Sequence, residues 1–509
     1  MSAFHVRFSV NLPHYQRKGY PMNNKQEFPK STDVLIVGAG PAGMTLAISL
    51  KQLGVDCVVI DRLPSAPDDT RAAFVQPRTL EYLRRIHVAG PMIDDGIKPR
   101  GFAFADLERD LIRLSYEGLD SPYPFLLIIP QWQTQRHLDQ RFGELGGSVL
   151  RGVRLLDLVP EFPGSAATVV DSTGALRVIN ARFVAGCDGV RSRVRDRLGI
   201  GFPGSSPEQM FGVADVRFDG WPADRVETAF TLSPDGMLIS SPLPGDMVRV
   251  VASVPPGTPA PTGHDVDQLI QTRGPGWLRN GTVTELLSSA TWHVQERVAT
   301  QFRHGNTFLV GDAAHTHSPA GGQGMNTGIQ DAANLAWKLH HVLCLGAPES
   351  LLDSYDAERR PNAQQLIEFT HQIATLATLT GQKERQMRDD ILAALSQVPG
   401  VTEALSVRFS QIAIGYGDSS EPFAPGTRVN PDIMGAEDLT WSLLTPDAAP
   451  PDLPTGFKVT VSKDVSQPVA VRPDGIVASA ELVHELFGFN AAPVAVQGNG
   501  HRRLQLTHS

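Results

Sequence analysis

The 509-residue sequence contains only three cysteines, Cys57, Cys187 and Cys344, and no two of them form a C-x-x-C pair. This scarcity excludes a disulfide scaffold and a zinc ribbon, and it suits the reducing cytoplasm, where we expect the protein to reside. Positive charge is also in short supply, because the net charge is −9 and no basic stripe is evident. We therefore expect no nucleic-acid partner.

Long hydrophobic runs are absent as well. The most apolar stretch, residues 34–50, is too short to span a bilayer and contains three glycines and a proline. Neither end of the sequence shows an apolar or amphipathic anchor, so we expect no stable membrane insertion. Residues 1–30 lack the continuous apolar segment of a secretory signal. We interpret them as a mobile arm and hypothesise that Met22 is the natural start, with residues 1–21 dispensable.

What the sequence does contain is an apolar strand followed directly by a glycine-rich turn and an apolar helix. Gly38, Gly40 and Gly43 have the spacing G-x-G-x-x-G between the strand 34–37 and the helix that continues through residues 44–50. In dinucleotide sites the first glycine permits a tight turn, the second lets the backbone approach a pyrophosphate, and the third lets helix pack on strand. The pyrophosphate lies at the helix N-terminus, where N–H groups are unpaired.

An acidic residue follows at the distance that such a site requires. The next apolar strand, residues 55–60, ends in Asp61, where dinucleotide sites carry an acid that binds a ribose hydroxyl. A glycine-rich turn alone could be merely structural. The turn and Asp61 together predict a dinucleotide cofactor.

A second block, residues 183–195, combines an apolar strand, an Asp188-Gly189 turn and a strongly basic helix start. Arginines in the first turn of a helix oppose the helix dipole. A segment that breaks a local rule in this way indicates a site that needs positive charge.

A third block, residues 307–326, runs from an apolar strand through Gly311-Asp312 and a glycine-rich turn into a helix. It also contains the H-x-H pair His315 and His317. Because no acidic or thiol ligands stand nearby, we expect loop packing from this pair and no metal site.

The rest of the chain predicts two further units. Residues 202–293 contain strand-like segments at 211–218, 228–232 and 247–254, which predict a largely antiparallel sheet inserted into the first domain. Residues from about 423 onward carry a hairpin signal at 472–475 and predict a small α/β module. Between these units we expect Pro361 to open a long helix.

With its blocks in this order, the sequence resembles the class A flavin-dependent aromatic hydroxylases, the para-hydroxybenzoate hydroxylase superfamily, over residues 32–361. The resemblance rests on Gly38-Ala-Gly-Pro-Ala-Gly43 with Asp61-Arg62, on the Asp188-Gly189 block, and on the block from Gly311-Asp312 to Asn326. Residues 70–72, 130–134 and 355–361 match further family blocks, while Gln135 stands where the family usually has Glu, a departure we expect to be mild.

The resemblance implies an α/β fold with a Rossmann-like FAD-binding domain of the glutathione-reductase type, discontinuous over residues 31–201 and 294–400. It implies an inserted antiparallel-sheet substrate domain at residues 202–293, to which residues 100–128 are expected to contribute. Residues 423–509 resemble the degenerate thioredoxin-like domain of the phenol and polyketide hydroxylase branch. Because this tail lacks redox cysteines, we assign it packing or dimerisation, and a homodimer stays open.

The resemblance also implies roles for individual residues. Asp312 is expected to accept a ribityl hydroxyl, and the helix start at Gly324 to stabilise negative charge on reduced flavin. Arg191, with Arg193 and Arg195, is a candidate for the phosphates of NAD(P)H. The expected cofactor-binding residues are Gly38, Gly40, Pro41, Ala42, Gly43, Asp61, Arg62, Arg71, Gln131, Asp188, Arg191, Gly311, Asp312, Gly322, Gly324, Met325 and Asn326.

The implied activity is that of an FAD-dependent, NAD(P)H-consuming monooxygenase that hydroxylates a phenolic ring through a C4a-hydroperoxyflavin formed with O₂. The sequence assigns no catalytic base, and it leaves open both a small phenol and a polyketide-like substrate. It also leaves open the choice of nicotinamide, the regiochemistry and the oligomeric state. Two alternatives share the same fold: Baeyer–Villiger or epoxidising oxygenation, and a non-catalytic flavin-binding sensor or assembly module.

Overall fold

The computed structural model describes residues 28–66, 72–206, 210–319, 321–379, 381–417, 419, 421–435, 437–450 and 453–488. Its largest sheet has eight strands: β18, β19, β10, β1, β2 and β7 are neighbours in that order, and β9 and β8 extend the sheet from β10. The central neighbours run parallel. The strands are β1 Ser31–Val37, β2 Cys57–Asp61, β7 Val149–Arg151, β8 Arg154–Glu161, β9 Gly164–Val170, β10 Leu176–Gly186, β18 Arg303–His304 and β19 Thr307–Leu309.

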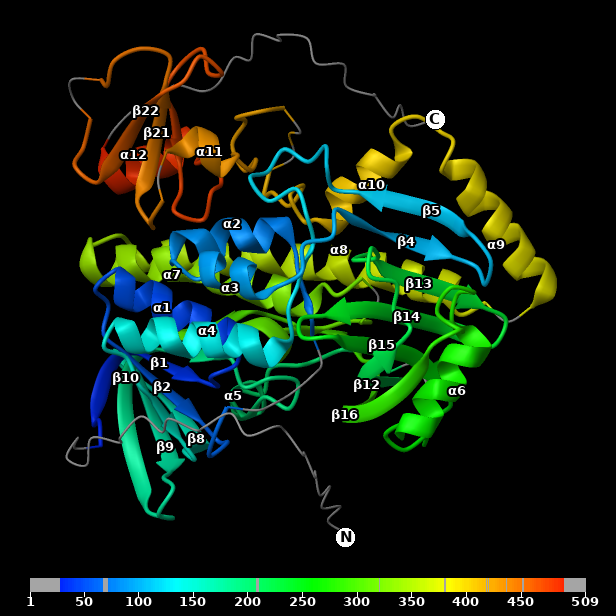
Figure 1. Ribbon diagram of the computed structural model, residues 1–509. Helices are drawn as coiled ribbons and strands as arrows, with labels where there is room; N and C mark the ends of the chain where they lie inside the picture. Colours follow the sequence, from blue (N-terminus) through cyan, green and yellow to red (C-terminus); the bar gives the residue numbers. More distant parts are fainter. Residues whose placement is uncertain are drawn as a thin grey trace.

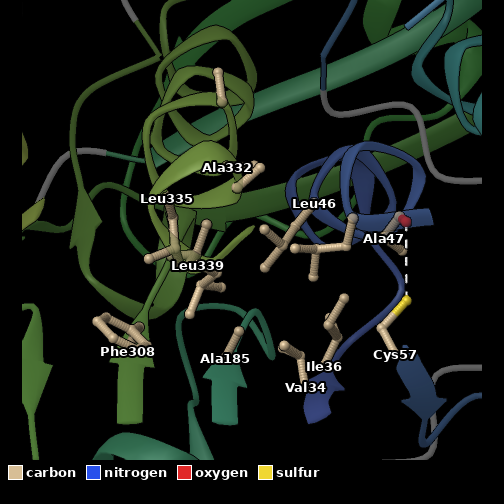
Figure 2. Packing of buried hydrophobic residues seen from close by; sticks show 14 of the residues in the cluster. Val34, Ile36, Leu46, Ala47, Cys57, Ala185, Phe308, Ala332, Leu335 and Leu339 are labelled. Atoms are coloured by element: carbon tan, nitrogen blue, oxygen red, sulfur yellow. Dashed lines mark hydrogen bonds between the residues drawn. The ribbon is translucent and has the colours of Figure 1, made fainter. Parts of the chain in front are cut away.

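Helices cover one face of this sheet (Figure 1). They are α1 Pro41–Gln52, α2 Pro77–Arg85, α3 Ala89–Asp95, α4 Gln131–Glu144 and α7 Gly324–Cys344. Figure 2 shows Val34 and Ile36 of β1 beneath Leu46 of α1, and Phe308 of β19 beneath Leu335 of α7. All five side chains are fully buried. Burial of each such side chain contributes about 1.5–3 kcal/mol, which explains why the apolar runs read from the sequence form this layer.

A second sheet has the order β16, β12, β15, β14, β13, β4 and β5, and only the β13–β4 pair is parallel. The expectation of a largely antiparallel sheet is confirmed, and its edge strands β4 and β5 come from far upstream in the chain. The strands are β4 Gly101–Ala105, β5 Asp110–Ser115, β12 Met210–Asp219, β13 Thr228–Ser233, β14 Gly236–Leu243, β15 Met247–Val254 and β16 Thr282–His293, and α6 Gly263–Arg273 packs against this sheet.

Three helices follow α7 in the chain, α8 Asp353–Ala377, α9 Gln382–Leu395 and α10 Val401–Phe409, and the last two pack against β5. The expectation that Pro361 opens a helix is wrong, because α8 begins at Asp353 and Pro361 lies in its interior. Proline normally disrupts a helix by removing an N–H donor. Here the preceding turn is fixed by tertiary contacts, since Tyr355 donates to Leu309 O (2.7 Å) and the buried Arg359 pairs with Asp331.

The C-terminal module has a three-stranded sheet in the order β22, β21, β23. Its elements are α11 Pro431–Met434, β21 Trp441–Thr445, β22 Phe457–Val461, β23 Val469–Val471 and α12 Ala480–Phe487. The hairpin signal is confirmed, because Gly475 N donates to Arg472 O (2.9 Å) and Arg472 N donates to Ile476 O (2.8 Å). A thioredoxin-like topology for this module stays a prediction. The remaining elements are β3 Phe74–Val75, β6 Leu127–Ile128, α5 Arg193–Arg197, β11 Gly204–Ser205, β17 Glu296–Val298, β20 His315–Thr316 and the 3₁₀ turns Gly311–Ala313 and Glu349–Leu352.

The C-terminal module docks on α7 and α8 through buried polar contacts. Arg472 bonds both carboxylate oxygens of Glu358 (2.7 and 3.0 Å). Trp441 Nε1 donates to His341 Nε2 (3.0 Å), while His341 Nδ1 lies 2.8 Å from Trp337 O. The tautomer that satisfies both contacts is the neutral one with the proton on Nδ1.

Because of this docking contact, we expect the free energy of unfolding to decrease at acidic pH. Burial lowers the pKa of His341 to about 4. Between pH 6.5 and about pH 4 the imidazole of His341 is therefore protonated in the unfolded chain and neutral in the folded chain. The free energy of unfolding is expected to fall across that window, by roughly 3 kcal/mol at its acid end. Urea unfolding at several pH values tests this, with His341→Gln as the non-titrating control. Equal pH dependence in both proteins would contradict the assignment.

Among the residues described, no helix is both long and apolar enough to cross a bilayer. Arg71, Met22 and nearly all of the expected N-terminal arm lie outside the described residues.

Candidate functional site

The carboxyl ends of four parallel strands meet at one edge of the large sheet. β19, β10, β1 and β2 are consecutive neighbours, and Val37 stands in register with both Gly186 and Ile60. Gly186 is in turn in register with Leu309. The segments that follow these strands carry the three sequence blocks and Asp61. Residues that are about 270 positions apart in the chain therefore assemble into one site, where parallel α/β sheets bind their ligands.

The three glycines of the glycine-rich turn have two different roles: two lie in close contact with other backbone atoms, and one borders open space. A Cβ on Gly38 would lie 2.3 Å from Cys187 O, and one on Gly43 would lie 2.1 Å from Gly38 O. A Cβ on Gly40 would have no heavy atom within 4 Å. Gly40 is also the N-cap of α1, and no side chain caps that helix. Gly38 and Gly43 thus permit close packing, while Gly40, with Pro41 and Ala42 behind it, leaves room for a phosphate group at a helix N-terminus.

Asp61 lies at the end of β2 and holds the glycine-rich turn. It accepts hydrogen bonds from Ala39 N (2.7 Å) and Leu63 N (2.8 Å). The buried Gln135 supports the same turn, because its Nε2 donates to Ala39 O (3.0 Å). Arg62 is exposed next to Asp61. The position that departs from the family pattern, Gln135, is therefore a direct support of the turn.

Gln131 is the first residue of α4. Its backbone N donates to Ala72 O (3.0 Å), and its Oε1 accepts from Ala72 N (3.1 Å). These two bonds fix the chain immediately after Arg71.

Asp188 provides an unsatisfied acceptor at the end of β10. Its Oδ2 accepts from Arg193 N (2.6 Å) and Val194 N (3.2 Å), so it holds the start of α5. Its Oδ1 is buried and has no partner among the described residues. Burial raises the pKa of this carboxyl. An orphaned acceptor beside the glycine-rich turn fits a hydroxyl donor such as a ribose.

The three arginines that follow Asp188 separate in the structure. The buried Arg195 donates to Ala313 O and Val190 O (2.9 Å each), and its guanidinium lies 3.9 Å from the centroid of the Phe202 ring. Those contacts tie α5 to the Gly311–Ala313 turn. Arg191 and Arg193 have exposed side chains, so they carry the positive charge that this edge presents to solvent.

A buried ionic cluster anchors the Gly311–Ala313 turn. Asp331 Oδ2 accepts from Gly311 N (3.0 Å) and contacts His315 Nε2 (2.7 Å), while its Oδ1 accepts from Arg359 Nε (2.7 Å). Asp331 and Arg359 are fully buried. Burial alone would raise the pKa of Asp331, but the charges of Arg359 and His315 outweigh it and hold that pKa below its usual value. Asp312 is exposed and free to meet a ligand.

The turn before α7 is clamped by Asn326. Its Nδ2 donates to Phe74 O and to Gly322 O (2.9 Å each), and its Oδ1 accepts from Gln76 N (2.8 Å). Gly322 has φ +63° and lies against Phe74, where a Cβ would be 2.5 Å from the ring. These contacts fix the backbone that leads into α7.

The first residues of α7, Gly324 and Met325, present an uncapped helix N-terminus to the site. No side chain caps this helix. His317 lies above it, since a Cβ on Gly324 would be 2.9 Å from His317 Nε2, and His317 Nδ1 contacts Ser318 O (2.6 Å). Burial lowers the pKa of His317, which keeps the ring neutral beside the positive end of the helix dipole.

Comparison with known proteins agrees with this geometry. A family model described as "FAD binding domain" matches residues 31–370. Pentachlorophenol 4-monooxygenase of Sphingobium chlorophenolicum is 34% identical over 407 residues, which cover 79% of this chain and 74% of the relative. This chain belongs to the FAD-dependent aromatic monooxygenases.

The monooxygenase is also similar to two proteins of Streptomyces rimosus that are named for tetracycline compounds. The 12-dehydrotetracycline 5-monooxygenase/anhydrotetracycline 6-monooxygenase of Streptomyces rimosus is 32% identical and covers 81% of this chain and 83% of the relative. The structure of the OxyS anhydrotetracycline hydroxylase from Streptomyces rimosus matches with a TM-score of 0.77 and 27% identity, over 91% of this chain and 100% of that one. The monooxygenase thus shares its fold across nearly its whole length.

The monooxygenase fits FAD at three observed features: the open space at Gly40, the orphaned Asp188 Oδ1 and the uncapped start of α7. Sequence reasoning named a residue at each of them. It missed the residues that hold these features in place through hydrogen bonds and ion pairs, above all Asp331, Arg359 and Gln76. For Asp331 the available signal was that it is the one acidic residue in the stretch 324–344.

Filling the space at Gly40 is expected to weaken FAD binding without harming the fold. Gly40→Ala introduces a methyl group that meets no protein atom but occupies the space for the phosphates, and we expect at least a tenfold rise in the Kd for FAD, about 1.4 kcal/mol. Gly90→Ala in α3, which also meets nothing within 4 Å, is the matched control. Fluorescence titration of the apoprotein with FAD and thermal unfolding of both variants check this. A drop in apoprotein Tm specific to Gly40→Ala would refute it.

Proposed function

We propose that this monooxygenase hydroxylates a phenolic or polyketide-like aromatic ring at the expense of NAD(P)H and O₂. The observation that carries the proposal is an aromatic cluster that contacts the glycine-rich turn before α7. A Cβ on Gly321 would lie 3.0 Å from the Phe409 ring, and Phe409 is in edge contact with Phe102 (centroids 5.1 Å apart). Phe102 and Phe230 come from the second sheet, with centroids 5.3 Å apart. A flat aromatic substrate suits such walls.

When bound, FAD supplies the hydride acceptance, oxygen activation and oxygen transfer of the reaction. The chain supplies the surroundings. The uncapped start of α7 would offer N–H groups that stabilise negative charge on reduced flavin. Asn326 keeps that turn in one geometry. The phenylalanine walls exclude water from the reacting atoms.

The nicotinamide has no Rossmann domain of its own in this proposal, because the sequence has a single G-x-G-x-x-G. Arg191 and Arg193 are exposed, and only Nε of Arg193 donates to a backbone carbonyl, Leu156 O (3.4 Å), whereas both Nη atoms of the buried Arg195 are engaged by backbone carbonyls. We therefore propose Arg191 and Arg193 as the contact and leave Arg195 out. Arg191→Gln should raise the KM for NAD(P)H and leave FAD content unchanged.

The deciding experiment is NAD(P)H oxidation and O₂ uptake by the purified yellow protein with a panel of phenols and each nicotinamide. Oxidation stimulated by a phenol, together with a hydroxylated product, supports the proposal. Bound FAD with stimulation only by ketones or alkenes would replace it with Baeyer–Villiger or epoxidising chemistry. Bound FAD that no substrate stimulates would favour a flavin-binding sensor. Sedimentation of the same preparation tests whether the protein forms a homodimer.

A further inference from the structure

A row of polar side chains crosses the second sheet from β13 to β16. Thr228 Oγ1 lies 2.9 Å from Ser241 Oγ, and Ser241 is in register with Arg249. Arg249 is in register with Asp215, and Asp215 with Ser288. The row has one residue in each of five neighbouring strands, β13, β14, β15, β12 and β16.

The row lies on the face that carries the aromatic cluster. Side chains alternate between the faces of a strand. In β15, Val248 and Val250 pack toward α6, and Val251 packs with Phe102 and Phe230. Arg249 therefore shares the face of Val251. The same alternation places Asp215 with Val213, on the cluster's face.

The ion pair in this row leaves one donor unused. Arg249 Nε and Nη2 donate to the two oxygens of Asp215 (2.7 and 2.9 Å). The two side chains are only 3% and 7% exposed. Arg249 Nη1 and Ser288 Oγ are buried and have no partner among the described residues. A buried charged donor without an acceptor is costly, so its partner is expected to come from outside the chain.

The charge and position of these donors define the ligand. Asp215 already neutralises Arg249, so a second carboxylate would place two anions on one guanidinium, whereas a carbonyl, phenol or enol oxygen fits. Thr228 is in register with Phe102, and β4 lies three strands from β15. At about 4.8 Å between neighbouring strands, Arg249 lies roughly 14 Å along the sheet from Phe102. A single phenol ring next to Phe102 would not reach it.

We propose that the substrate is an extended, multi-ring aromatic compound whose far edge carries a carbonyl or enol oxygen that accepts from Arg249 Nη1 and Ser288 Oγ. This inference rests on the proposed function, because it assumes that the reacting ring binds at the Phe102–Phe409 wall. It assigns Arg249 and Ser288 to specificity, at a distance from the oxygen-transfer chemistry.

The test compares two probes on the FAD-loaded enzyme, a hydroxylated naphthacenequinone and the hydroxynaphthacene of the same ring skeleton without the quinone oxygens. The change in flavin absorbance on titration gives each Kd. Arg249→Lys keeps the charge opposite Asp215 and removes the spare N–H groups. It is expected to weaken the quinone about 10- to 100-fold and the hydroxynaphthacene less than twofold. Ser288→Ala is expected to weaken the quinone about two- to tenfold.

Two further proteins guard against a folding artefact. The double variant Arg249→Met/Asp215→Leu removes both charges together, which cores often tolerate, and it should show the same selective loss. Ser240→Ala is the matched control, since Ser240 Oγ is also buried without a partner but belongs to the row that faces α6. It should change neither Kd by more than twofold.

The outcomes separate the two proposals. Equal quinone binding by wild type and Arg249→Lys overturns the assignment of Arg249, and hydroxylation of single-ring phenols by both would then leave the proposed function standing. Selective loss of quinone binding without any hydroxylated product would support the polar row and overturn the proposed function.

Discussion

Arg359→Met is expected to lower the free energy of unfolding by about 3–5 kcal/mol and to release FAD, because it strips the buried Asp331 of its charge partner. Asp331 would keep contacts to Gly311 N and His315, but it would remain a fully buried anion. The Gly311–Ala313 turn, which contains Asp312, is held by the hydrogen bond from Gly311 N to the Asp331 carboxylate. Thermal and urea unfolding with FAD absorbance on the same samples measure both effects.

The neighbouring Arg360 supplies the matched control. Its ion pair with Asp356 is about one-third exposed, so Arg360→Met is expected to cost less than about 1 kcal/mol. The pH dependence gives a second check. In wild type the pKa of Asp331 is held below its usual value, so its stabilisation is present above about pH 4 and is lost as pH falls through the folded-state pKa.

Without Arg359, burial dominates and raises the pKa of Asp331, so protonation would remove the uncompensated charge. The difference between wild type and Arg359→Met should therefore shrink as the pH falls from 8 toward 4. A difference that stays constant over that range would show that lost packing, and not the charge pair, is responsible.

Gly38→Ala is expected to abolish folding around the cofactor edge, with a loss of more than about 4 kcal/mol. The new Cβ would lie 2.3 Å from Cys187 O, 2.6 Å from Cys187 C and 2.9 Å from Asp188 Cα. All three are backbone atoms, so relief requires the ends of β1 and β10 to move apart. The φ of +106° adds conformational strain. We expect an insoluble or colourless protein.

Gly174→Ala is the control that separates the backbone strain of a positive φ from the steric clash expected at Gly38. Gly174 has φ +86° in the turn before β10, and a Cβ there meets nothing within 4 Å. The substitution should cost only the left-handed penalty of about 1–2 kcal/mol and leave a yellow, soluble protein. If Gly38→Ala behaved like Gly174→Ala, the close contact with Cys187 would not matter to the fold.

Local sequence rules were sufficient for the parts of the site that strand and turn chemistry dictate. The glycine spacing, Asp61 and the Asp188-Gly189 turn are short-range patterns, and the structure brings them to one edge because parallel strand ends must coincide. Three strands of the second sheet, β12, β13 and β15, were readable for the same reason, whereas β14 and β16 were not identified. Pro361 misled because a local helix-breaking rule yields to the buried contacts of Tyr355 and Arg359.

Contacts between distant segments were not readable. Asp331 and Arg359 are 28 positions apart, and Asn326 contacts Phe74 across 252 positions. No periodicity links such pairs. The same holds for β4 and β5, whose membership in the second sheet was expected only from the family resemblance, and for the pairing of Arg249 with Asp215. These contacts depend on topology, which a sequence pattern does not encode directly.

The position of β1 between β2 and β10 has a consequence for how the protein is made. Gly38 packs against Cys187, which is synthesised about 150 residues later, and at about 5–20 residues per second the ribosome needs roughly 10–30 s to supply it. Until then β1 exposes an apolar, unpaired edge. The Gly311–Ala313 turn and α7 appear later still. FAD therefore meets a complete site only after about two-thirds of the chain has left the ribosome, and the nascent protein depends on protection from aggregation throughout that interval.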